Sequence, residues 1–324
     1  MSNIFRTRQV YKPFEYEWAE EYTQKQQMAH WLKSEVPMSS DISDWKTLLT
    51  PAEKNIIGNI LKGFTQVEVV VSDYWTTKVT RWFPKPEIVA AAVTMGSFEV
   101  IHQQAYSHLN DSLGLDDYSE FLSDRSTKEK LDSLIARGGS HEDIARSLAV
   151  FSAFAEGVQL FSSFAVLMSF SLRNLMKGVG QIVSWSVRDE SLHSNFGCKL
   201  FRQVIRENPE MWTDDFKRTV YDAARLTVEL EENFIDKVFE MGDIPNLAKE
   251  DLKIFIKHRA NVKLGDLGLK TNWRSIYDEE GKKALERMDW FDSLTAGVNH
   301  QDFFAGRVTD YSRGHVDFSK IFDE

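Results

Sequence analysis

The chain is poor in the residues that cross-link or interrupt a polypeptide. Its 324 residues include a single cysteine, Cys198, together with seven prolines and seventeen glycines. One cysteine excludes an internal disulfide and any cysteine-rich metal site, and it fits a reducing compartment. The small numbers of proline and glycine favour long helices over many short strands.

The sequence also has little that would point to a membrane or to nucleic acid. The first eight residues, MSNIFRTR, contain no apolar signal core, so we expect a cytoplasmic protein. The longest uncharged run, residues 157–172, is rich in serine and shorter than the ~20 apolar residues that span a bilayer. A formal net charge of -10 argues against a general nucleic-acid surface. We therefore expect neither nucleic acid nor a membrane as a partner.

What the sequence does contain is long stretches of apolar residues at helical spacing. Hydrophobic residues make up 42% of the chain and aromatic residues 12%, which is typical of a large globular core. The pattern predicts an all-α fold with one main domain, residues 1–296, and a mobile polar tail, residues 297–324. Residues 35–44 are expected to be a polar connector. The expected helices cover residues 14–33, 51–83, 86–114, 140–172, 174–207, 213–241 and 247–264.

One short motif occurs twice, 91 positions apart. Glu99 and His102 form a Glu-x-x-His pair, and Glu190 and His193 form another. A helix turns 100° per residue, so each pair projects from one helical face, and both faces are otherwise apolar. Two further glutamates, Glu68 and Glu156, occupy core-facing positions of other predicted helices. Two such pairs and two lone glutamates are the ligand pattern of a dinuclear site in a four-helix bundle.

Buried carboxylates and imidazoles are costly unless they bind something. Four carboxylates nearly neutralise two divalent cations, and together with two imidazoles they suit iron or manganese better than zinc. Apolar neighbours would exclude water from such a site; they are Val67, Val69, Phe154, Leu160 and Val183. The same residues could instead form buried structural ion pairs, and Tyr106, one turn beyond His102, could be an ordinary core tyrosine.

These residues resemble the motifs of the small, radical-generating subunit of class I ribonucleotide reductase, a ferritin-like helical bundle. The resemblance covers nearly the whole chain. It implies that the metal ligands are Glu68, Glu99, His102, Glu156, Glu190 and His193. It further implies that Tyr106 is the radical tyrosine, that Trp31 and Asp189 carry the electron and proton path from His102, and that Tyr311 passes the radical on.

One position departs from the common members of that family. Glu68 stands where the diiron members with a tyrosyl radical have aspartate. Glutamate there resembles the manganese-containing subclasses, and the retained Tyr106 resembles the dimanganese members most. Of two metal ions per chain, a dimanganese pair is therefore favoured, with manganese–iron or diiron as alternatives. The resemblance then implies that the oxidant stays on the metals and not on Tyr106.

The implied function is that of an oxidoreductase subunit that supplies an oxidising equivalent for ribonucleotide reduction. Reducing ribose in this family needs several cysteines, which this chain lacks, so a large subunit is the expected partner. That subunit would bind the C-terminal tail, and the small subunit is expected to be a homodimer. Two alternatives remain: a ligand-binding manganese–iron oxidase that acts alone, and a ferritin-like metal-storage protein. The first would not need Trp31, Asp189 and Tyr311, and the second is usually shorter.

Overall fold

The computed structural model describes residues 3–115, 138–240 and 242–305, and these are almost entirely helical. In that part of the chain there is no strand, only an isolated bridge between Ile244 and Leu247. The prediction of an all-α fold is confirmed.

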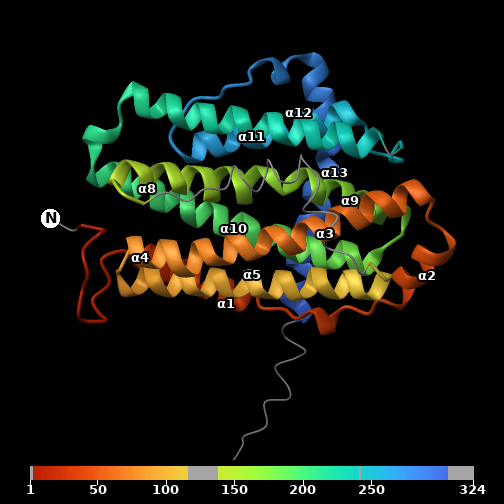
Figure 1. The fold of residues 1–324 in the computed structure, drawn as a ribbon, viewed down its shortest axis with the longest axis horizontal. Helices are drawn as coiled ribbons and strands as arrows, with labels where there is room; N and C mark the ends of the chain where they lie inside the picture. The colour runs from red at the N-terminus through yellow and green to blue at the C-terminus, as the bar shows by residue number, and fades with distance from the viewer. Residues whose placement is uncertain (1–2, 116–137, 241, 306–324) are drawn as a thin grey trace, which may run out of the picture.

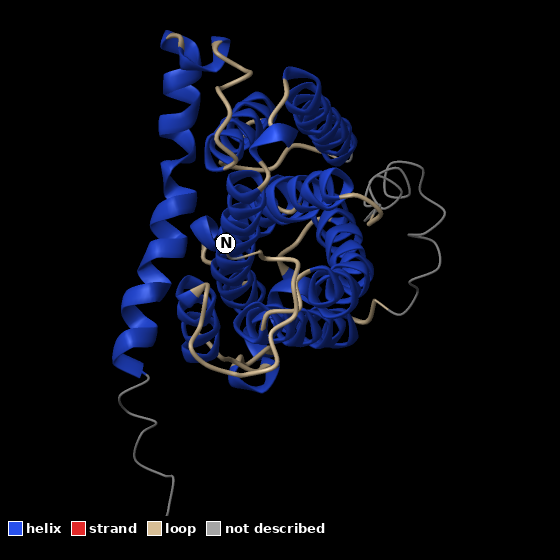
Figure 2. Cartoon of the chain, turned by 90° about the vertical axis from the view of Figure 1, so that its left-hand side faces the viewer, coloured by secondary structure: helices blue, strands red, loops and turns tan. Residues whose placement is uncertain are grey.

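Four helical rods surround the centre of the molecule (Figure 1). They are α3 (Pro51–Asp73), α5 (Pro86–Leu113), the stretch from α8 (His141–Leu148) through α9 (Phe161–Ser169), and α10 (Lys177–Glu207). The flanking helices are α1 (Glu17–Met28), α2 (Ser39–Thr47), α4 (Thr80–Trp82), α11 (Asp214–Glu240), α12 (Lys249–Asp266) and α13 (Glu279–Ala305). Helices α11 and α12 lie as a layer over α8 and α9, and α13 runs along one side of the bundle (Figure 2).

The ends of the rods follow from local sequence. Thr50 caps α3 by accepting a hydrogen bond from the backbone N–H of Glu53, and Pro51 occupies the first turn. Helix α5 begins at Pro86 and ends at Leu113; the next residue, Gly114, has a φ of 71°, a left-handed conformation that favours glycine. These boundaries agree with the expected ones to within a residue or two.

Two π-helical stretches that the sequence pattern did not reveal occur along the rods, one directly after α3 and one between α8 and α9. One spans Tyr74–Val79, between α3 and α4, and the other spans Ala149–Gln159, between α8 and α9. A π-helical turn adds a residue to the α-helical repeat and so rotates the faces that follow it; such stretches are frequent at functional sites.

Three expectations about the segments outside the rods need revision. Helix α1 ends at Met28, so Trp31 lies beyond it and not inside a helix to residue 33. The expected connector 35–44 contains the start of α2. Helix α13 continues to Ala305, past the expected beginning of the tail at residue 297.

Helix α2 was missed because its role is tertiary. The carboxylate of Asp41, which is fully buried, accepts hydrogen bonds from the backbone N–H groups of Gly178 and Val179, both at 2.9 Å. Asp44 accepts another from the N–H of Met176 at 3.0 Å. Two acids on α2 thus cap the N-terminus of α10, where the helix dipole favours negative charge.

One helical stretch, His141–Arg173, is long and apolar enough to cross a membrane by length and composition. Most of it, 94% of its most apolar window, is buried inside the protein. Its apolar character therefore belongs to the core of the bundle.

Candidate metal centre

The structure brings the six expected metal-binding residues together from four rods. Glu68 comes from α3, the pair Glu99 and His102 from α5, and the pair Glu190 and His193 from α10. Glu156 comes from the π-helical stretch Ala149–Gln159. All six side chains are fully buried.

Within this cluster, two groups of four residues each could hold one metal ion. The first group is Glu68, Glu99, His102 and Glu190; the second is Glu99, Glu156, Glu190 and His193. In each group, one ligand atom per residue lies within 4.8 Å of all the others. Glu99 and Glu190 belong to both groups, so their carboxylates can bridge two ions. Each group adds one histidine and one glutamate of its own.

Both histidines point the same ring nitrogen towards the shared carboxylates. The Nδ1 atom of His102 lies 3.2 Å from Glu99 Oε2 and 3.1 Å from Glu190 Oε1. The Nδ1 atom of His193 lies 2.6 Å from Glu99 Oε1 and 3.9 Å from Glu190 Oε2. The arrangement is a compact cluster in which every side chain faces a common centre.

The hydrogen bonding of the cluster fits bound cations. Apart from the close approaches of the two Nδ1 atoms, both carboxylate oxygens of Glu68, Glu99 and Glu190 are buried without a hydrogen-bond donor among the described residues. Buried polar atoms are normally paired, because an unpaired one costs about 1–3 kcal/mol. So many unpaired acceptors around one point indicate a site built for metal.

The electrostatics lead to the same conclusion. Burial and the neighbouring Glu99 raise the pKa of Glu68 well above its ordinary value. Burial and Glu190 do the same for Glu156. Burial opposes ionisation of Glu99 as well, but His193 and His102 hold its pKa below the ordinary value. Without cations, four carboxylates in one buried space cannot all be charged, and two divalent ions would remove that conflict.

A chain of polar contacts leads away from His102. Its Nε2 atom lies 3.3 Å from Asp189 Oδ2, and the same oxygen accepts a hydrogen bond from the indole N–H of Trp31 at 2.8 Å. The rings of Trp31 and His102 are 5.8 Å apart. Gln26 donates to the other oxygen, Asp189 Oδ1, at 3.1 Å. Asp189 and Trp31 are therefore held beside the cluster.

Tyr106 is fully buried beside the cluster. Its ring centre lies 6.4 Å from that of His102 and 4.9 Å from that of Phe64. Within the described residues, its hydroxyl makes no hydrogen bond to Glu68, whose oxygens are both unpaired. Tyr311, the remaining expected site residue, lies outside the described residues.

Sequence reasoning overlooked Trp75, which touches the site directly. Its indole N–H donates a hydrogen bond of 2.5 Å to Glu156 Oε1. Trp75 lies seven positions after Glu68, on the same helical stripe, and that spacing was the available signal.

Of the five apolar residues expected to keep water from the site, four are buried or half-buried. The prediction is wrong for Val69, whose side chain is 55% exposed. Directly after Glu68, it projects 100° away from the core-facing side of α3.

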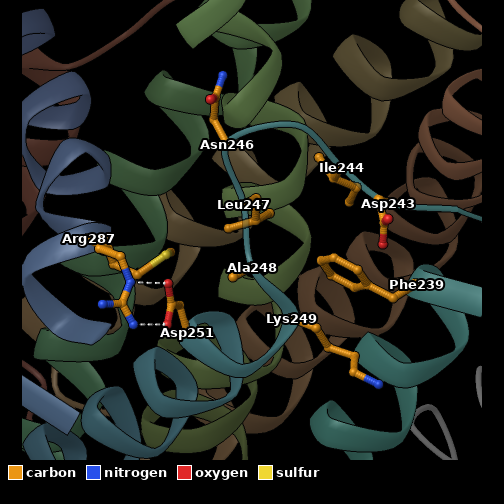
Figure 3. A pocket seen from close by; sticks show the side chains of 10 residues that line it. Phe239, Asp243, Ile244, Asn246, Leu247, Ala248, Lys249, Asp251 and Arg287 are labelled. Carbon is orange, nitrogen blue, oxygen red and sulfur yellow. Dashed lines mark hydrogen bonds and ion pairs between the residues drawn. The ribbon is translucent and has the colours of Figure 1, made fainter. Parts of the chain in front are cut away.

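A cavity of about 790 Å³ lies elsewhere in the molecule (Figure 3). It is bounded by the end of α11, the loop before α12 and the first half of α13, and Arg287 pairs with Asp251 at its edge through two hydrogen bonds of 2.7 Å. None of the residues of the buried cluster lines it, so it is separate from the candidate metal centre.

Comparison with known proteins gives a consistent result over most of the chain. Residues 8–280 match the family described as "Ribonucleotide reductase, small chain". A probable ribonucleoside-diphosphate reductase small subunit of Invertebrate iridescent virus 3 is 33% identical over 97% of this chain and 86% of its own length. The corresponding protein of Invertebrate iridescent virus 6 is 34% identical over 96% of this chain and 95% of its own length.

Solved structures agree on the fold. A putative class I ribonucleotide reductase from Bacillus halodurans matches with a TM-score of 0.78 at 23% identity, covering 86% of this chain and 99% of that one. The dimanganese(II) form of NrdF from Streptococcus sanguinis matches with a TM-score of 0.74 at 20% identity, covering 83% and 95%. The predicted ferritin-like bundle is therefore confirmed.

Proposed function

The chain belongs to the ribonucleotide reductase small-chain family, and from that premise we propose that it holds two metal ions and delivers a one-electron oxidant to a large subunit. The observation that carries the proposal is the pair of four-residue groups that share Glu99 and Glu190, with Asp189 joining His102 to Trp31. Proteins of this family are oxidoreductase subunits that work with a large subunit, where the ribonucleotide is reduced.

In this proposal six side chains hold the ions. Glu68 and His102 would hold one ion, Glu156 and His193 would hold the other, and Glu99 and Glu190, which belong to both groups, would contribute to both. Two redox-active ions supply, when bound, the one-electron oxidant that the partner subunit consumes. The buried side chains Phe154, Leu160 and Val183 exclude water from it.

The route out of the site begins at His102. Asp189 accepts hydrogen bonds from Trp31 and faces His102 Nε2, so it can hold a proton while an electron moves from the indole towards the site. Burial opposes the charge on Asp189, but the bond to His102 keeps the pKa of this carboxyl below its ordinary value. A charged Asp189 fixes both rings. We propose Tyr311, in the segment that follows α13, as the next step towards the large subunit.

We propose manganese in both positions. Two features support this: glutamate at position 68, and a Tyr106 hydroxyl that makes no hydrogen bond to it within the described residues. A phenol uncoupled from the carboxylate is poorly placed to pass its proton and electron to the site together. Elemental analysis and an EPR spectrum of protein purified from its own host test this. Two manganese ions with a multiline signal are expected; a tyrosyl doublet with iron would contradict it.

The outer face of α5 supports a homodimer. Between Val89 and Ser107 the only acidic or basic side chains are Glu99 and His102, and both are buried in the metal cluster. The outward positions include Val93, which is 48% exposed, and Val100, which is 41% exposed. A strip without charge, on a chain with 27% charged residues, suits a second copy related by two-fold symmetry. Sedimentation of the full chain tests this, and a monomer would contradict it.

A further inference from the structure

Two adjacent aromatic residues connect the candidate metal centre to the neighbouring π-helical stretch. Trp75 donates its indole N–H to Glu156 Oε1 at 2.5 Å, and the hydroxyl of Tyr74 lies 3.3 Å from Ser152 Oγ. Trp75 and Tyr74 belong to the π-helical stretch Tyr74–Val79, whereas Glu156 and Ser152 belong to the facing stretch Ala149–Gln159. The two irregular stretches are thus joined by two polar contacts in parallel.

The same residues begin a row of rings that leads outward. The ring centres of Trp75 and Tyr74 are 5.1 Å apart, and those of Tyr74 and Trp82 are 6.1 Å apart, both edge to face. Tyr74 and Trp75 are almost completely buried, and Trp82 is partly exposed. Trp82 is the last residue of α4, at one end of the bundle (Figure 1). These spacings are those of rings in direct contact.

Indole and phenol are the side chains that lose one electron most readily, apart from thiols. Electron tunnelling slows exponentially with distance, so rings in contact pass an electron far faster than one long transfer through aliphatic side chains. Burial raises the pKa of Tyr74, so the phenol is neutral and keeps its proton in the contact with Ser152. The nearest stacked ring beside this row, Phe151, lies 4.2 Å from Tyr74 and is much harder to oxidise.

We propose that Trp82, Tyr74 and Trp75 form an electron relay from the protein surface to Glu156, and that the relay discharges an oxidant left unused at the dinuclear site. This rests on the proposed function in one respect, since the oxidant to be discharged is the one held there. The relay is separate from the Trp31 route, which reaches the site through Asp189 and His102. It gives the Glu156 side an outlet of its own.

The step balances for one electron. Trp75 gives an electron to the oxidised site and regains one from Tyr74, which regains one from Trp82. An outside reductant of the enediol class, such as ascorbate, then gives one electron to Trp82 and releases one proton to water. When Tyr74 loses an electron, its phenolic proton shifts along the contact with Ser152 Oγ, and it returns to the phenol with the electron from Trp82. The rings end unchanged, and the site has gained one electron.

The first experiment follows the discharge in the metal-loaded full chain without the large subunit. Ascorbate is added, and the oxidised signal is followed by stopped-flow absorbance and freeze-quench EPR. Tyr74→Phe and Trp82→Phe should slow the decay by about tenfold or more, with unchanged metal content. Trp212→Phe is the matched control, because Trp212 is a partly buried indole that packs on Phe201 and Phe216, away from the site. Equal decay in all three variants and the parent would overturn the relay.

The second experiment does not depend on bound metal. A ruthenium photo-oxidant is attached to the variant Arg81→Cys; position 81 is exposed, whereas the native Cys198 is buried. After flash-quench oxidation beside Trp82, a transient phenoxyl signal should appear and should be absent when Tyr74→Phe is added. A phenoxyl signal that survives Tyr74→Phe, or none in the labelled parent, contradicts the relay. Failure to bind metal would instead count against the proposed function alone.

Discussion

The two halves of the candidate metal centre have the same ligand types but different surroundings. The Glu68 half contains Glu68 and His102, and its histidine is fixed from outside the cluster, because His102 Nε2 faces Asp189. The Glu156 half contains Glu156 and His193, and there the glutamate is fixed from outside, because Trp75 donates a hydrogen bond to Glu156 Oε1. The other glutamate and the other histidine lack such a partner: within the described residues, the carboxylate of Glu68 and the Nε2 atom of His193 make no hydrogen bond.

Because of this difference, we expect the two halves to have different roles. A histidine fixed by a carboxylate that also holds Trp31 is suited to passing an electron and a proton together. In Glu156 one oxygen already accepts a hydrogen bond from Trp75 and only Oε2 is without a partner, whereas both oxygens of Glu68 are without one among the described residues. The repeated Glu-x-x-His motif does not reveal the difference between the halves, because Trp31 and Trp75 come from other segments of the chain.

The largest effect is expected where the halves meet. Glu190→Ala removes a carboxylate that belongs to both groups, so the chain should lose both ions. Glu156→Ala removes a ligand of one group and should leave the Glu68 half able to bind. Elemental analysis after dialysis against excess chelator-free buffer measures the difference. Undiminished metal in Glu190→Ala would contradict the bridging assignment.

The next effect tests the outlet on the His102 side. Asp189→Asn keeps the shape of the side chain but removes the charge that faces His102 and accepts from Trp31. Turnover with the large subunit should fall by about 10–100-fold, the usual cost of losing such an outer partner. Metal content should be nearly unchanged. Glu210→Gln, which also removes one negative charge but at an exposed position after α10, is the control. A loss of metal equal to the loss of turnover would mean that Asp189 only supports the ligands.

A smaller effect is expected from the outer partner of the other half. Trp75→Phe keeps an aromatic ring but leaves Glu156 Oε1 without its donor. The affinity of the Glu156 half for Mn(II) should change by about tenfold, equivalent to about 1.4 kcal/mol. Calorimetric titration with Mn(II) measures this, with Trp212→Phe as the control. If both halves weaken equally, the partner of Glu156 is not specific to its half.

The sequence was sufficient for the rods and for the six residues between them, because helical periodicity places Glu68, Glu99 and Glu156 on core-facing stripes. It also indicated Trp31 and Asp189, through the family resemblance. For the three glutamates, the face predicted from helical spacing is the face that the structure buries.

What the sequence did not reveal depends on contacts between distant segments. Trp75 is not recognisable as a site residue from the sequence, because nothing in the pattern shows that its N–H meets a carboxylate 81 positions away. Helix α2 was missed because Asp41 acts on the backbone of α10. The π-helical stretches escaped notice because an added residue per turn leaves no mark on a stripe only a few turns long.

The last prediction compares the protons that the two halves release. Burial raises the pKa of Glu68 and of Glu156, so in the metal-free protein both carboxyls keep their protons to a higher pH than usual. A cation must displace those protons, so apparent affinity should rise with pH and level off once pH exceeds the raised values. Glu68→Gln and Glu156→Gln should each reduce the proton release on metal binding by about one. A pH-stat titration measures this; a reduction in only one variant would mean that the halves also differ in charge, beyond their hydrogen-bond partners.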